Sequence, residues 1–263
     1  MLRQRVITTI VLLPILIAAI WFGGCWLALL VAAIASAGSI EFYRLDRNNN
    51  LSPLHYFGTI IIIALILLPY FFNYITITHI LSAAVVISLI WLLFSPRKDH
   101  AFNQWVWIMA GILYLGLMLG FWVKLRNIDQ GRDYVFWLLF IIIANDSAAY
   151  FTGKSLGRHA LAPRISPNKT WEGAIGGLFA STITCLLFGF IFSLPFPYWQ
   201  LVIMGIGVSI LAQFGDLIES LLKRNSAVKD SGTIIPGHGG ILDRMDSYIL
   251  TAAVAYYVIT ALI

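Results

Sequence analysis

Nine apolar runs, each long enough to cross the roughly 30 Å hydrocarbon core of a bilayer, constrain the fold of this chain more than any other feature. Backbone N–H and C=O groups find no water inside lipid, so these runs are expected to be helices rather than strands of an open sheet. The predicted fold is therefore an all-α, polytopic integral membrane protein with about nine transmembrane helices. The runs are residues 6–21, 25–40, 56–72, 75–94, 105–123, 134–150, 171–192, 199–218 and 247–261.

Composition and charge agree with a membrane location and indicate an orientation. Apolar residues make up 60% of the chain and charged residues 11%, against about 45–50% and 25% in soluble domains. If the N-terminus is cytoplasmic, all but three of the 17 Lys and Arg lie on the inner side, as the positive-inside rule expects. The three exceptions, Lys124, Arg126 and Arg132, occupy a charged loop, 124–133, which a re-entrant segment or a miscounted span would explain.

We expect a single membrane-embedded domain over residues 1–263. The helices of residues 1–133 offer little chemistry and are expected to be mainly scaffold, whereas residues 134–263 carry the expected catalytic helices and cytoplasmic motif loops. The basic N-terminus is followed at once by a second apolar run, which favours an uncleaved first span over a signal peptide. No basic stripe is interleaved with polar surface, so nucleic acid is not an expected partner.

The densest polar segment is residues 220–246, SLLKRNSAVKDSGTIIPGHGGILDRMD, between two apolar runs. Asp243 and Asp246 are three residues apart, so a helix that begins just before them places both carboxylates on one face, where they can share a cation. Asp216, Glu219 and Lys223 share a helical stripe at the end of the preceding run. Carboxylates beside Lys and Arg suit Mg²⁺ and polyphosphate, and the nearby glycines would let backbone N–H groups approach an anion.

The same segment carries a family signature. The matching positions are Ser220, Leu222, Lys223, Arg224, Lys229, Asp230, Gly232, Ile235, Pro236, His238, Gly239, Gly240, Ile241, Asp243, Arg244, Met245 and Asp246. This pattern resembles the signature of phosphatidate cytidylyltransferases (CDP-diacylglycerol synthases). Two more stretches are similar to that family, residues 145–157 and the SPNKTWEG segment at 166–173. The resemblance covers the chain from about Asn145 onward, and the N-terminal half matches only in hydropathy.

The resemblance implies transfer of CMP from CTP to phosphatidic acid, giving CDP-diacylglycerol and pyrophosphate for phospholipid biosynthesis. It also implies that Asp216, Asp243 and Asp246 coordinate a pair of metal ions, which we expect to be Mg²⁺ with a second cation left open. The expected catalytic residues are Asp216, Lys223, Arg224, Lys229, Asp243 and Asp246. The expected substrate-binding residues are Asp146, Ser166, Asn168, Lys169, His238, Gly239, Gly240 and Arg244.

The expected surroundings follow from the substrates. CTP is a cytosolic nucleotide and phosphatidic acid a membrane lipid, so we expect a protein of the bacterial inner membrane whose active site faces the cytoplasm. The expected partners are CTP, phosphatidic acid and the lipid bilayer, and a homodimer is left open.

Two acidic residues have simpler interpretations beside the functional one. A carboxylate within a span is a functional candidate by default, but Asp146 could instead form a helix–helix hydrogen bond with its neighbour Asn145. Glu219 is accounted for by a surface ion pair with Lys223 at i,i+4, which contributes only a few tenths of a kcal/mol.

Two loop features have local explanations as well. Ser166 or Thr170 could cap the helix that begins at Trp171, whereas Asn168 and Lys169 are not needed for capping and are assigned to phosphate or nucleotide contacts. His238 could act as a general base, or it could shape the loop or bond a phosphate. A phosphate monoester is already largely ionised near pH 7, so the reaction needs little proton abstraction.

Two other functions fit parts of the pattern. One is a CTP-dependent kinase of a polyprenol or other lipid alcohol, which would keep the nucleotide and change the acceptor. The other is a transporter whose carboxylates carry ions or protons. Against the transporter, the charges cluster at the inner ends of the spans, and the sequence shows no inverted repeat.

Overall fold

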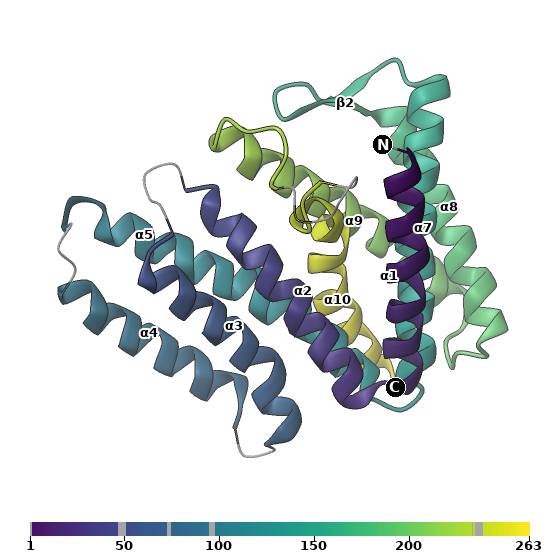
Figure 1. Ribbon diagram of the computed structural model, residues 1–263. Helices are drawn as coiled ribbons and strands as arrows, with labels where there is room; N and C mark the ends of the chain where they lie inside the picture. The colour runs from purple at the N-terminus through teal and green to yellow at the C-terminus, as the bar shows by residue number, and fades with distance from the viewer. Residues whose placement is uncertain (1, 47–50, 73–74, 95–97, 233, 235–238) are drawn as a thin grey trace. The chain divides into compact units, whose positions relative to one another are not determined.

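The computed structural model of the chain is built almost entirely from helices (Figure 1). It describes residues 2–46, 51–72, 75–94, 98–232, 234 and 239–263. Within these residues every apolar run of the sequence coincides with a helical segment, which confirms the predicted polytopic, mainly helical fold. The helical elements are α1 (Leu2–Phe22), α2 (Gly24–Arg44), α3 (Pro53–Phe71), α4 (Ile77–Leu93), α5 (Lys98–Gly111), η1 (Ile112–Leu117), α6 (Met118–Arg126), α7 (Gly131–Leu156), α8 (Trp171–Ile191), α9 (Tyr198–Asn225) and α10 (Leu242–Leu262).

Seven helical segments of the described chain are long and apolar enough to cross a membrane, and two shorter apolar helices, Ile10–Phe22 and Ile77–Leu93, accompany them. The fifth apolar run is one unbroken helical segment, in which α5 and α6 are joined by the π-helical turns of η1. The chain divides into two compact units.

The first unit comprises Met1–Val123 and Ser226–Arg244. In it α2 packs against α3, and Tyr43 near the end of α2 is buried between neighbouring helices. Its ring fills space left by Gly58 on α3 and Gly111 on α5, because a Cβ at either glycine would overlap it. The turn between α1 and α2 contains Gly23 and Gly24 at φ angles of 62° and 53°, a conformation that glycine adopts without steric cost.

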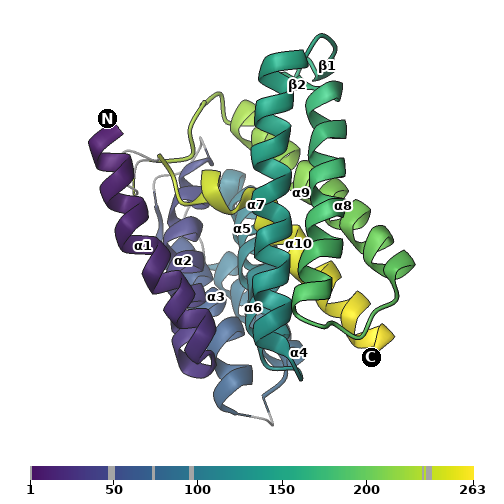
Figure 2. The ribbon, with the colours of Figure 1, turned by 90° about the vertical axis from the view of Figure 1, so that its right-hand side faces the viewer.

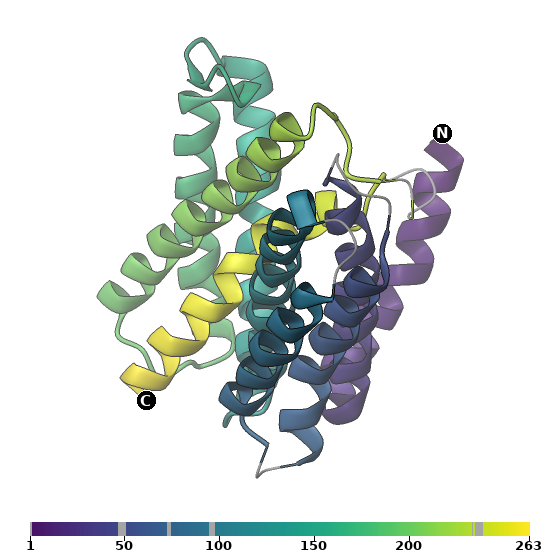
Figure 3. The ribbon, with the colours of Figure 1, turned by 90° about the vertical axis from the view of Figure 1, so that its left-hand side faces the viewer.

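The second unit comprises Lys124–Asn225 and Met245–Ile263. Here α7 and α8 lie side by side (Figure 2), and the chain then turns back from α8 into α9 (Figure 3). Small residues allow this close approach: a Cβ at Gly177 on α8 would press on Asn145 of α7, and one at Gly205 on α9 on the backbone of Thr182. The Ser181 hydroxyl donates to the Gly205 carbonyl at 2.7 Å. A hydrogen bond therefore stabilises the close backbone contact of α8 with α9, in addition to packing.

A short antiparallel hairpin between α7 and α8 is the exception to the all-helical prediction. Strands β1 (Ala160–Ala162) and β2 (Ser166–Thr170) form it, and they turn the SPNKTWEG segment from an expected loop into a strand followed directly by α8. The Thr170 hydroxyl accepts from Gly173 N–H at 3.1 Å and caps α8, which confirms one of the two predicted caps. Glu172 in the first turn of α8 pairs with His159 Nδ1 at 2.6 Å and so fastens the start of the hairpin.

Candidate functional site

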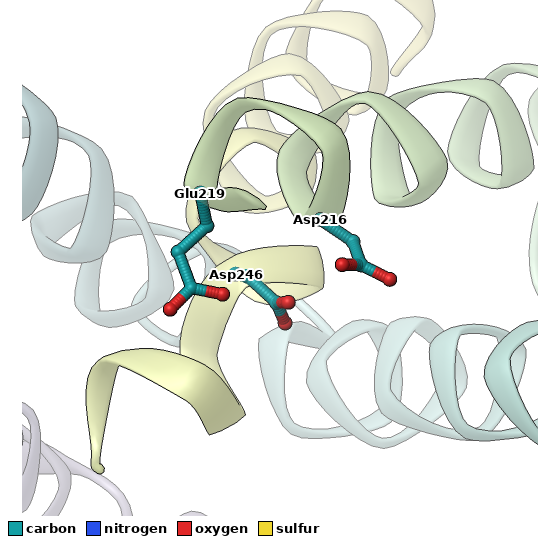
Figure 4. A group of neighbouring side chains, drawn as sticks. All are labelled: Asp216, Glu219 and Asp246. Carbon is teal, nitrogen blue, oxygen red and sulfur yellow. The ribbon is translucent and has the colours of Figure 1, made fainter. Parts of the chain in front are cut away.

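Among the described residues, one group of carboxylates could hold a metal ion: Asp216, Glu219 and Asp246, whose ligand oxygens all lie within 4.8 Å of one another. Asp216 and Glu219 are three residues apart on α9 and therefore share one face of that helix, while Asp246 comes from the early turns of α10. Figure 4 shows the Asp246 carboxylate lying between the other two. Two of the three positions, Asp216 and Asp246, are those that the sequence singled out.

A glycine lets α9 and α10 approach closely enough to bring these groups together. A Cβ at Gly215 would overlap the carbonyl oxygen of Asp246 and would press on its carbonyl carbon. The residue next to Asp216 on α9 is therefore in direct backbone contact with the residue that carries the third carboxylate.

Two lysines balance part of the negative charge. Lys169 Nζ lies 2.6 Å from Asp216 Oδ2, and Lys223 Nζ lies 3.4 Å from Glu219 Oε1. Three carboxylates this close repel one another, and the two ammonium groups leave one negative charge uncompensated when all five groups are ionised. Hard divalent cations take carboxylate oxygens as ligands, so the donor set fits such an ion.

Glu219 is the residue of this group that was not predicted from the sequence. Its i,i+4 pairing with Lys223 is present, but the side chain is fully buried rather than part of a solvated surface pair. A buried carboxylate needs a cation or several hydrogen bonds to offset desolvation. Its spacing of three residues from Asp216 on a shared stripe was the signal that could have identified it.

Asp146 on α7 belongs to a chain of hydrogen bonds between helices. Its Oδ1 accepts a hydrogen bond from Asn145 Nδ2 at 3.0 Å and another from Ser247 Oγ at 3.4 Å. Ser247 directly follows Asp246 in the chain. Asn145 in turn accepts from Ser209 Oγ at 2.6 Å, and Gln213 donates to Ser209 at 3.0 Å. The predicted hydrogen bond with Asn145 is present but lies within α7, and the bonds to other helices come from Ser247 on α10 and, through Asn145, from Ser209 on α9, which were not foreseen.

Asp243, the remaining predicted metal ligand, accepts hydrogen bonds from backbone groups. Its Oδ2 receives the N–H of Ser231 at 3.1 Å and the N–H of Gly240 at 3.3 Å. The Gly240 N–H, which the sequence analysis offered to a phosphate, is therefore directed to a carboxylate of its own chain. Gly239 has a φ of 86°, which suits glycine, and His238 lies outside the described residues.

The other predicted residues lie along the same polar segments. Arg224 near the end of α9 donates through Nε to the Ile165 carbonyl at 3.2 Å and so ties the hairpin to that helix. Lys229 and Asn168 are exposed, Arg244 is exposed in the first turn of α10, and Ser166 is half-buried at the start of β2. The structure thus brings Lys169, Lys223 and Asp216 to one place, and it places Lys229 and Asn168 at the surface.

The helices and the carboxylate group define a class: a polytopic membrane protein with an acidic cluster on two of its helices that could hold a cation. The model of the cytidylyltransferase family matches residues 3–262, and the chain belongs to this family. It is 32% identical to phosphatidate cytidylyltransferase of Bacillus subtilis (strain 168), over 98% of this chain and 97% of the other.

Two further relatives support the assignment. The phosphatidate cytidylyltransferase of Brucella suis biovar 1 (strain 1330) is 34% identical over 97% of this chain and 92% of its own length. Phosphatidate cytidylyltransferase 5, chloroplastic, of Arabidopsis thaliana is 36% identical over 89% of this chain and 66% of its own length. The family resemblance therefore extends over the N-terminal half, where the sequence motifs gave none.

Proposed function

We propose that this chain transfers CMP from CTP to phosphatidic acid and releases pyrophosphate, forming CDP-diacylglycerol. The observation that carries the proposal is the group of three carboxylates with two lysines on α9, α10 and β2, in a chain that matches its family over nearly its whole length. Relatives of similar length are named phosphatidate cytidylyltransferase.

The reaction needs positioning more than proton transfer. An oxygen of the lipid phosphate attacks the α-phosphorus of CTP, a new P–O bond forms, and the bond from the α-phosphorus to the bridging oxygen breaks so that pyrophosphate leaves. The attacking phosphate is already ionised near pH 7, so orientation and charge neutralisation are the main requirements. We assign these to Lys169, Lys223, Arg224 and Lys229, which would bind phosphate oxygens.

Asp216, Glu219 and Asp246 would hold Mg²⁺, and the family resemblance adds Asp243 and a second cation to the proposal. When bound, the cation would neutralise phosphate charge and favour departure of pyrophosphate. Lys169 already lies against Asp216, which places an ammonium group where a nucleotide phosphate bound to the same cation could reach it. Asp146, held by Asn145 and Ser247, would fix α7 against the start of α10.

The proposed location is the inner membrane of a bacterium, with the acidic site facing the cytoplasm. Long apolar helices support the membrane location. The cytoplasmic orientation rests on the distribution of Lys and Arg and on the cytosolic source of CTP.

The test uses the purified protein in detergent with phosphatidic acid, Mg²⁺ and CTP labelled at the α-phosphate. Label entering the lipid phase with equal release of pyrophosphate is the expected result. If label from the γ-phosphate enters a lipid alcohol instead, the CTP-dependent kinase is the correct function. If neither label enters the lipid phase with either acceptor, both the CMP-transferase function and the kinase function are wrong.

A further inference from the structure

A buried carboxylate in the N-terminal half contacts the signature segment of the C-terminal half. Glu41, near the end of α2, has no exposed surface. Its Oε2 accepts the backbone N–H of Leu242, the first residue of α10, at 2.9 Å. The same oxygen accepts the Ser231 hydroxyl at 3.4 Å. All these residues lie within the first compact unit.

Two glycines of the signature are shaped around this carboxylate. A Cβ at Gly232 would overlap Glu41 Oε1, and a Cβ at Gly240 would lie 2.7 Å from Glu41 Oε2. On the α2 side, Gly38 faces Ile241, whose side chain would be 3.7 Å from a Cβ there. The residues just before α10 and its first residue therefore pack against α2 around Glu41.

Glu41 and Asp243 together receive the donors of this segment. Ser231 is shared between them, because its N–H donates to Asp243 and its hydroxyl to Glu41. Gly240 N–H donates to Asp243, and Leu242 N–H donates to Glu41. The first N–H groups of a helix have no partner within the helix, and a negative charge there is favoured by the helix dipole.

Burying the Glu41 carboxylate costs free energy unless hydrogen bonds or a cation offset the loss of water. A buried carboxylate is stabilised by a cation or by hydrogen-bond donors. Within the described part of the chain no Lys, Arg or His forms an ion pair with Glu41. Backbone and hydroxyl donors of the signature segment bond its Oε2, whereas its Oε1 is buried and has no hydrogen-bond partner among the described residues.

We propose that Glu41 is a positioning residue of the enzyme: it fixes Ser231 and the first turn of α10, and through them the direction in which α10 presents Asp243 and Asp246. This inference rests on the proposed function for its catalytic consequence. Glu41 touches no substrate in this role. It acts through the helix that carries the proposed metal ligands.

The test compares three variants of the full-length protein in detergent. Glu41→Met keeps an unbranched side chain of similar length but accepts no hydrogen bond, and Glu41→Gln keeps one acceptor oxygen without the charge. Ser39→Ala is the matched control, because Ser39 is equally buried on α2 and its hydroxyl contacts Thr59 on α3, at 2.9 Å, rather than the signature segment.

Three measurements separate positioning from general stability. Hydrogen–deuterium exchange of peptides covering residues 239–246 should be about tenfold faster in Glu41→Met, intermediate in Glu41→Gln and unchanged in Ser39→Ala. The Mg²⁺ concentration for half-maximal CMP transfer should rise in the same order, while the melting midpoint of Glu41→Gln stays near that of wild type. If Glu41→Met is too unstable to purify, Ser231→Ala removes one donor and should shift both readings in the same direction by a smaller factor.

Three outcomes would overturn the proposal. Unchanged exchange at 239–246 in the Glu41 variants would show that Glu41 does not hold the start of α10. Faster exchange with an unchanged Mg²⁺ requirement would make Glu41 a purely structural residue. Equal changes in Ser39→Ala would trace the effect to α2 packing. If wild type itself transfers no CMP, the proposed function fails, and the exchange data alone still decide whether Glu41 anchors α10.

Discussion

Glu219 is the side chain whose role depends most on its surroundings. Fully buried beside Asp216 and Asp246, it is expected to be a cation ligand, so Glu219→Gln should raise the Mg²⁺ concentration for half-maximal activity about tenfold or more. The measurement is a Mg²⁺ titration of CMP transfer. Asp129→Asn, which removes an exposed carboxylate in the turn between α6 and α7, is the control. A normal titration in Glu219→Gln would remove this residue from the proposed metal site.

Lys169 is expected to affect the metal and the reaction in opposite directions. Its ammonium group lies 2.6 Å from Asp216, where it competes with a cation for that carboxylate. Lys169→Ala should therefore strengthen binding of Mn²⁺ without nucleotide, by about two- to fivefold, while it slows CMP transfer because a phosphate contact is lost. Electron paramagnetic resonance of free Mn²⁺ measures the first effect, and the labelled-CTP assay the second.

A matched control for Lys169 is Lys154→Ala on α7, whose ammonium group lies over the ring of Tyr150, 5.7 Å from its centroid. This variant should leave Mn²⁺ binding unchanged. Weaker Mn²⁺ binding in Lys169→Ala would contradict the competition and would make Lys169 a support for the site.

For single side chains, the sequence predicted which residues lie near the site better than it predicted the groups that they contact. Asp216 and Asp246 were identifiable because each shares a helix face with other polar residues beside an apolar run. Thr170 was identifiable because a helix cap is a local feature. Glu219 was assigned to a surface pair since that pair satisfies every local rule. The acceptor roles of Asp243 and Glu41 depend on residues up to 201 positions away, and neither helical spacing nor local motifs specify such contacts.

Among the helices, the contact of α9 with α10 determines the acidic site. Gly215→Ala places a Cβ against the Asp246 carbonyl oxygen, and moving backbone apart is expected to cost about 1–3 kcal/mol of stability. We therefore expect a lower melting midpoint in detergent and weaker metal binding, since Asp246 moves away from Asp216. Thermal unfolding with and without Mn²⁺ measures both.

The same helix supplies the control. A Cβ at Gly207 of α9 meets nothing within 4 Å, so Gly207→Ala should be neutral or stabilising by up to about 1 kcal/mol, the helix preference of Ala over Gly. If both variants destabilise α9 equally, backbone contact at Gly215 is not the reason that the carboxylates meet.

Helix existence was predictable from the sequence, and helix ends were less so. An apolar run in lipid leaves the backbone few choices, which is why each predicted run coincides with a helix. The polar ends gave no such constraint: α9 continues to Asn225 and α7 to Leu156, both beyond the predicted runs. The β1–β2 hairpin was missed because a five-residue strand with Pro167 has no alternating apolar pattern.

For the molecule as a whole, the charged segment 124–133 was the obstacle to a consistent orientation. Two of its cations have partners in the second unit. Lys124 Nζ lies 5.7 Å from the centre of the Tyr256 ring on α10, and Arg132 pairs with Asp133 at 2.9 Å. The N-terminus-inside orientation remains the prediction because the other 14 of the 17 Lys and Arg lie on the inner side in that arrangement.

Helix α7 makes this orientation testable without reference to the rest of the protein. Its 26 residues span about 39 Å at 1.5 Å per residue, so the turn before it and the β1–β2 hairpin after it must lie on opposite faces of the membrane. In a background where Cys25 and Cys185 are replaced by Ala, an impermeant maleimide should label Asn127→Cys in intact cells, and Ala160→Cys only after permeabilisation. Both positions are exposed, so a difference reflects the membrane and not burial. Reversed labelling would place the hairpin that carries Lys169, and therefore the acidic site, outside the compartment that contains CTP. CTP could then not reach the site, and the proposed reaction would be wrong.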